Sequence, residues 1–262
     1  MAGERFGELL RDWRHRRRLS QMELSLDSSI STRHLSFVET GRSRPSRETV
    51  VRLAETLEVP LRERNTMLLA AGYAPIYAQR ALDSAEMEPV RTAIDRFLRA
   101  HEPYPALVMD RRHDMVAAND ALAGLTAGCA PELLEPPVNV TRLALHPEGM
   151  APRIANLEEW SAHLIGRLRR EAALSGDGAL EELRAEVEGY PGVCTEEVTA
   201  DRAPSEILVA LRLRDGDQEL AFISTVSTFG TALDITLAEL SIEAFYPANA
   251  QTAMRLLGEV GV

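Results

Sequence analysis

Two short helical segments separated by only three residues constrain the fold of this chain more than any other feature. Residues 21–28 follow Ser20, which can form a capping box with Glu23, and residues 32–39 follow Ser31, which can act as an N-cap. The second segment buries Leu35 and Val38, so its remaining side chains form a polar face. We therefore predict two packed helices, the second of which presents a polar surface.

This pair lies within a predicted all-α domain of five short helices over residues 1–75. In the first helix, the apolar residues recur at the spacing of one helix face. The fourth helix begins after Pro45-Ser46, and the fifth spans residues 61–71 and ends before Gly72. The apolar face of the first helix comprises Phe6, Leu9, Leu10 and Trp13.

Two helices with so short a connection and a polar second helix are typical of a helix-turn-helix, whose second helix enters the major groove of double-stranded DNA. Arg33 can donate two hydrogen bonds to a guanine, and Phe37 can contact a thymine methyl group. Arginines in the following loop can neutralise phosphates. The predicted DNA-binding residues are Gln21, Thr32, Arg33, His34, Ser36, Phe37, Thr40, Arg42 and Arg44.

The distribution of charge agrees with this prediction. Residues 1–80 hold 14 Arg and 10 acidic residues, a net charge of +4, whereas the remainder holds 15 Arg and 30 acidic residues, a net charge of −15. Such asymmetry is typical of a nucleic-acid-binding segment joined to a part with another role.

After a joint at residues 72–75, the pattern changes from helical to mixed. Residues 76–102 are predicted to form a connecting helical segment, and residues 103–262 an α+β domain. The predicted elements of that domain include strands at 105–109 and 115–118 and helices at about 156–172 and 178–188.

The clearest strand pattern comes late in the chain. A first strand alternates through Ile207, Val209, Leu211 and Leu213, and Asp215-Gly216 favours a hairpin turn into a strand with Leu220 and Phe222. A further strand is predicted through Leu233, Ile235 and Leu237. Its phase then shifts to Leu240 and Ile242, which predicts a β-bulge near Ala238 or Glu239.

Several stretches resemble known regulators. Residues 31–42 are similar to the helix-turn-helix of the lambda-repressor and XRE type, and residues 68–75, 104–111, 145–149 and 244–247 resemble the MmyB-like regulators. The resemblance implies that a PAS-like ligand-binding and dimerisation domain follows the DNA-binding domain. Its ligands are implied to be fatty-acid-like. Ser29 and Ser25 depart from the usual Gly and Ala, and a positive φ at Ser29 would cost about 1 kcal/mol.

The residues alone leave open whether the second domain has an ordinary packed core or a cavity, and the resemblance favours a cavity for a small apolar ligand such as a fatty acid. Apolar residues of the late strands and of helix 156–172 would line it, and His163 or Arg167 would bind a carboxylate. The predicted ligand-binding residues are Trp160, His163, Leu164, Arg167, Leu168, Leu211, Leu213, Phe222 and Ile235.

Other classes of protein are disfavoured. The chain has no GxSxG, HExxH, GxGxxG or GxxxxGK[ST] motif, so we expect no enzyme. The histidines lack metal-ligand spacing, and the two cysteines form no CxxC pair, so no metal or other cofactor is expected. No apolar run is long enough for a membrane span and no signal core follows the N-terminus, so we expect a cytoplasmic protein. The resemblance to the MmyB-like regulators implies that it forms a homodimer. The alternative is a DNA-binding adaptor whose second domain binds another protein.

Overall fold

The computed structural model describes residues 2–196 and 208–259. It divides into two compact units, each with its own core. The first contains Met1–Arg80 with two later segments, Ala173–Gly176 and Thr231–Ala238, and the second contains the rest. The predicted connecting segment 76–102 is thus divided between the two units at Arg80.

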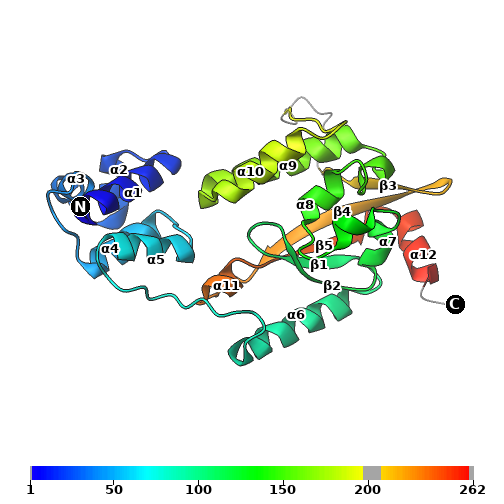
Figure 1. Cartoon of the computed structure of the whole chain (residues 1–262), viewed down its shortest axis with the longest axis horizontal. Helices are drawn as coiled ribbons and strands as arrows, with labels where there is room; N and C mark the ends of the chain where they lie inside the picture. Colours follow the sequence, from blue (N-terminus) through cyan, green and yellow to red (C-terminus); the bar gives the residue numbers. More distant parts are fainter. Residues whose placement is uncertain (1, 197–207, 260–262) are drawn as a thin grey trace. The chain divides into compact units, whose positions relative to one another are not determined.

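The five predicted helices of the first unit are confirmed (Figure 1). Ser20 forms the expected capping box with Glu23, and Ser31 accepts a hydrogen bond from the backbone of His34. Ser29 has φ 55°, so the left-handed turn usually assigned to glycine is made here by serine. The helices are α1 (Ala2–Arg16), α2 (Gln21–Ser28), α3 (Thr32–Glu39), α4 (Arg47–Thr56) and α5 (Leu61–Ala70).

The strand predicted through Leu233, Ile235 and Leu237, with its bulge, is wrong. Residues Ile235–Ala238 form a short helix, α11, which belongs to the first unit. The side chain of Asp234 accepts a hydrogen bond from the backbone of Thr236, which favours a helical start over an extended strand. The phase shift therefore marks the boundary between a helix and the strand that begins at Ser241.

The second unit is built on a five-stranded antiparallel sheet, which confirms the α+β, PAS-like class. The strand order is β2-β1-β5-β4-β3, so the first and last strands in the chain meet at its centre. The strands are β1 (Ala106–Met109), β2 (Met115–Ala118), β3 (Leu211–Asp215), β4 (Gln218–Thr228) and β5 (Ser241–Pro247). The helices are α6 (Glu88–His101), α7 (Leu122–Thr126), α8 (Val140–Leu145), α9 (Leu157–Ser175), α10 (Gly178–Glu188) and α12 (Ala250–Glu259), with three 3-10 turns, Ala85–Met87, Pro131–Leu134 and Ala151–Arg153.

The predicted hairpin at Asp215-Gly216 is confirmed. It joins β3 to β4, with Leu211 opposite Phe222 and Leu213 opposite Leu220, and Gly216 has a φ of +59°. Leu211 and Leu213 are buried on one face of β3, as their alternation indicated. Ile207, which begins the predicted alternation, lies outside the described residues.

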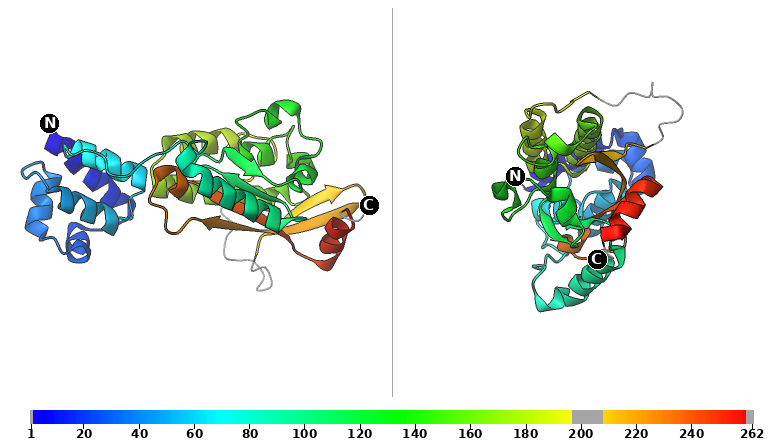
Figure 2. Two further views of the ribbon diagram at one scale, coloured as in Figure 1. Left: turned by 90° about the horizontal axis from the view of Figure 1, so that it is seen from below. Right: turned by 90° about the vertical axis from the view of Figure 1, so that its right-hand side faces the viewer.

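Helices cover both faces of the central strands. On one face, Ala106 and Ile242 pack in a cluster with Ile94 and Leu98 of α6, which crosses this side of the sheet (Figure 2). On the other face, Leu107 and other apolar residues join the larger core with α8, α9 and α10. Because β1 and residues 242–245 of β5 are buried, a polar side chain at these positions needs a partner or a cavity.

Candidate functional sites

Helix α3 presents the polar surface predicted for DNA contact. Thr32 and Arg33 are exposed at its start, whereas His34, Ser36 and Phe37 are half-buried. The guanidinium of Arg33 lies 5.5 Å from the centre of the Phe37 ring, a cation–π contact that restricts its orientation. The hydroxyl of Thr32 donates to Ser25 Oγ at 3.0 Å, so the departure from alanine at position 25 links α2 to α3.

A buried ion pair holds the other end of α3. Arg14 of α1 donates from Nε to Glu39 Oε1 at 2.7 Å and from Nη2 to Oε2 at 3.1 Å, while its Nη1 donates to the carbonyl of Leu19. Gln21 Nε2 donates to Glu39 Oε2 at 2.7 Å, so one amide N–H of this predicted DNA-binding residue is already used. This bidentate, charge-assisted network fixes α3 against α1 and the start of α2.

The same crossing of α1 and α3 requires a glycine. A Cβ atom on Gly7 would lie 2.4 Å from the backbone oxygen of Glu39, well inside contact distance. Glycine at this position therefore allows the two backbones to approach closely enough for the ion pair to form.

The loop after α3 carries the remaining predicted DNA contacts, and they differ in their surroundings. Thr40 and Arg42 are exposed. The Thr40 hydroxyl donates to the carbonyl of Ser36 at 2.8 Å. Arg44 instead donates from Nε to the carbonyl of Ala71 at 3.0 Å and lies over the ring of Tyr73. Arg44 therefore ties the loop to the end of α5.

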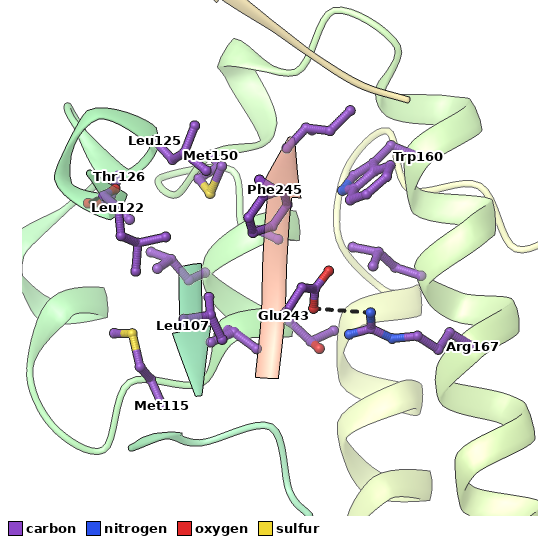
Figure 3. Close-up of a pocket in the computed structure, with 16 residues that line it drawn as sticks. Leu107, Met115, Leu122, Leu125, Thr126, Met150, Trp160, Arg167, Glu243 and Phe245 are labelled. Carbon is purple, nitrogen blue, oxygen red and sulfur yellow. Dashed lines mark hydrogen bonds and ion pairs between the residues drawn. The ribbon is translucent and has the colours of Figure 1, made fainter. Parts of the chain in front are cut away.

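The second unit contains a cavity of about 60 Å³ between the sheet and α7, α8 and α9. Its wall is almost entirely apolar, as Figure 3 shows around Leu107, Met150, Trp160 and Phe245. A mostly apolar cavity with a few polar groups in its wall is the usual form of a small-molecule site.

Four of the nine predicted ligand-binding residues line this cavity: Trp160, Leu164, Arg167 and Leu211. They share the face of α9 and the end of β3 that point to the interior. Leu168, Leu213 and Phe222 are fully buried in the surrounding core but do not line the cavity, and half-buried His163 stacks on Trp160 at 5.4 Å. Ile235 was wrongly placed in the sheet, since it lies in α11 of the first unit.

One end of the cavity wall carries an ion pair. Arg167 of α9 donates from Nη1 to Glu243 Oε2 at 3.1 Å, and the two side chains are 13% and 6% exposed (Figure 3). The Nε atom of Arg167 is also buried, and it makes no hydrogen bond within the described residues. It lies 3.6 Å from Glu171 Oε1. A buried guanidinium N–H in this state is short of one acceptor.

A further polar chain leads away from this pair. His113 contacts Glu171 through Nε2 and Thr141 through Nδ1, both at 2.6 Å, and Thr141 lines the cavity. Burial by itself would raise the pKa of Glu171, but the hydrogen bond and charge of His113 and the charge of Arg167 outweigh it and lower the pKa. Glu171 is therefore ionised at neutral pH.

Glu243 is the functional candidate that sequence reasoning missed. In the alternating pattern of β5 it lies between Ile242 and Ala244, where a charged residue indicates a solvent-facing side. The structure buries both faces, so Glu243 points to the cavity side with Phe245. The sequence held one indication of Glu243. Arg167 lies among the buried residues of an amphipathic helix, and a buried arginine needs an acidic partner.

Together these features define a class: a helix-turn-helix unit joined to an α+β unit with a ligand-type cavity. The chain matches the MmyB-like transcription regulator ligand binding domain over residues 90–257 and a helix-turn-helix domain over residues 5–67. It therefore belongs to the MmyB-like transcription regulators, and it is a DNA-binding transcription regulator with a ligand-binding domain.

In the part of the chain that the structure describes, no helix is long and apolar enough to cross a membrane.

Individual relatives match part of the chain. The uncharacterized HTH-type transcriptional regulator RghRB of Bacillus subtilis (strain 168) is 31% identical over 97 residues, which cover 35% of this chain and 68% of the relative. Two crystal structures of the clp gene regulator ClgR from Corynebacterium glutamicum are 26% and 22% identical and cover 28% and 39% of this chain and 90% and 96% of theirs. Both have a TM-score of 0.25, which adds nothing about the fold.

Proposed function

We propose that the second unit senses a small, mostly apolar ligand of fatty-acid-like shape, and that its occupancy tunes sequence-specific binding of the first unit to DNA. The cavity supports this proposal, because its wall is mostly apolar and has a charged pair at one end. An ordinary core at this place would fill with side chains and would leave no room beside a buried guanidinium.

The cavity as it stands accommodates only the start of a chain, because about 60 Å³ holds few heavy atoms. Met115 and Met150 lie in its wall. Methionine side chains are unbranched and change shape readily, so they can move aside for a longer apolar chain. Each methylene group that enters would contribute about 0.8 kcal/mol of burial.

On the DNA side, Arg33 reads a base edge in the major groove, and Arg42 neutralises a phosphate of the backbone. Two copies of the chain bind a pseudo-palindromic operator, with their α3 helices about 34 Å apart. The protein acts by binding alone and catalyses no reaction.

The experiment that tests the ligand is mass spectrometry of small molecules extracted from the purified full chain. An amphiphile with one apolar chain at near-stoichiometric amount supports the proposal. An empty cavity, together with thermal melts that no apolar compound shifts, would refute it and favour the adaptor that binds another protein. Sedimentation equilibrium tests the homodimer, and a purely monomeric chain would refute that part.

A further inference from the structure

The charged end of the cavity offers a hydrogen-bond donor and an acceptor side by side. Arg167 on α9 and Glu243 on β5 approach from opposite walls, as Figure 3 shows, and share a single hydrogen bond. The guanidinium has five N–H groups, of which the buried Nε makes no hydrogen bond among the described residues and lies 3.6 Å from Glu171 Oε1, and the Glu243 carboxylate has two oxygens. A head group that both accepts and donates would therefore complete this end.

The balance of charge at this end opposes an anion. Among the described residues that line the cavity, Arg167 and Glu243 are the ionisable ones, so the wall has no net charge. Glu171, 3.6 Å from Arg167 Nε, is a second carboxylate close behind it, and His113 contacts Glu171 at 2.6 Å. A ligand carboxylate would be the third negative group around one guanidinium. The Arg167 and Glu243 side chains are 13% and 6% exposed, so repulsion between Glu243 and a ligand carboxylate is several times stronger there than in solvent.

We propose that the cavity selects amphiphiles whose head group is uncharged, a hydroxyl or an amide, over the carboxylate of the same chain length. The head oxygen accepts a hydrogen bond from the Arg167 guanidinium, and its O–H or N–H donates to Glu243. This inference rests on the proposed function, since it needs an apolar ligand in the cavity, and it specifies the chemical class of that ligand.

The test compares three probes that share one chain: 1-octanol, octanamide and sodium octanoate. Each is titrated into the full-length protein at pH 7.5, where octanoate is ionised, and binding is followed by calorimetry. We expect the alcohol and the amide to bind at least roughly tenfold more tightly than octanoate, a ratio that corresponds to 1.4 kcal/mol.

Glu243→Gln removes the repelling charge with little change of shape, so octanoate should gain at least about tenfold and the preference should disappear. Glu219→Gln, which makes the same change at an exposed position of β4 in the same sheet, should leave all three affinities unaltered. Binding of octanoate to the wild type as tight as that of octanol overturns the inference, whether or not Glu243→Gln folds. If none of the three probes binds the wild type, the proposed function itself fails.

Discussion

Both units bury an Arg–Glu pair, and the two pairs differ in what surrounds them. In the first unit, Arg14 and Glu39 share two hydrogen bonds, and Gln21 and the Leu19 carbonyl occupy further sites on them. In the second unit, Arg167 and Glu243 share one hydrogen bond beside a cavity. The first pair is closed, whereas the second leaves donor capacity unused.

The difference shows how similar residues serve two purposes. A fully satisfied buried pair fixes one arrangement of helices, which suits a surface that must match the geometry of DNA. A partly satisfied pair beside a cavity keeps the free-energy cost of its unused hydrogen-bond donor until a ligand binds. Binding there can therefore alter the free energy of the surrounding core. The proposed ligand-tuned regulation requires both features: a rigid DNA-binding unit, and a second unit whose buried ion pair a ligand can complete.

The sharpest test of this comparison is the matched change Glu39→Gln and Glu243→Gln. Removing one partner of a closed buried pair leaves an uncompensated charge and typically costs about 3–5 kcal/mol. We expect Glu39→Gln to lower the free energy of unfolding of the first unit by about this amount, and Glu243→Gln to lower that of the second unit by clearly less, because its pair is already incomplete.

Each unit can be followed separately, since Trp13 is buried in the first and Trp160 in the second, and the chain has two tryptophans. Urea unfolding in Trp13→Phe and Trp160→Phe backgrounds, monitored by fluorescence, isolates each transition. Equal losses of unfolding free energy for the two Glu→Gln variants would show that the two pairs do not differ as described.

The cavity can be distinguished from the core around it by placing a tryptophan at two neighbouring positions of α9. Leu164 lines the cavity, so Leu164→Trp should fill it, block probe binding and leave the stability of the second unit nearly unchanged. Leu168 is fully buried without facing the cavity, so Leu168→Trp should cost about 1–3 kcal/mol through overpacking. Chemical denaturation of the full chain checks both, and similar losses would argue against a cavity.

On the DNA side, Arg33→Ala should weaken binding to the operator by about 1–3 kcal/mol while leaving random duplexes and protein stability nearly unaffected, because Arg33 is exposed. Gel shifts against operator and scrambled duplexes measure this. Arg96→Ala, an equal loss of charge on the exposed surface of α6, is the control. Operator binding by Arg33→Ala at wild-type affinity would place the reading surface elsewhere.

The smallest effects should separate two arginines of the loop after α3. Arg42→Ala should weaken operator and random DNA equally and reduce the slope of log affinity against log salt by about 0.9. Arg44→Ala should instead destabilise the first unit by about 1 kcal/mol, since it loses the contact with the Ala71 carbonyl. Identical salt slopes for the wild type and Arg42→Ala would exclude the phosphate contact.

Local features of this chain could be predicted from sequence, and long-range contacts could not. The caps at Ser20 and Ser31 and the hairpin at Gly216 depend on residues within a few positions, so their patterns identify them. By contrast, the hydrogen bonds from Gln21 to Glu39 and from Arg44 to the Ala71 carbonyl join residues that are 18 and 27 positions apart. No periodic pattern in the sequence indicates such contacts.

The errors in the predicted cavity have a similar origin. Ile235 lay in an alternating run, but the hydrogen bond from Thr236 to Asp234 favours a helix there. Glu243 reads as a solvent-facing residue unless both faces of β5 are known to be covered. A pattern of alternating polar and apolar residues identifies the buried face of a strand only when the other face is exposed to solvent.

The most direct measurement of a ligand-tuned regulator is the affinity of the full chain for its operator, selected from random duplexes, with and without 1-octanol. At concentrations that calorimetry shows to saturate the cavity, we expect the alcohol to change wild-type affinity at least about fivefold. The Leu164→Trp variant, whose cavity is filled, should bind the operator equally in both conditions. Unchanged wild-type affinity with the cavity saturated would contradict coupling between the cavity and DNA binding.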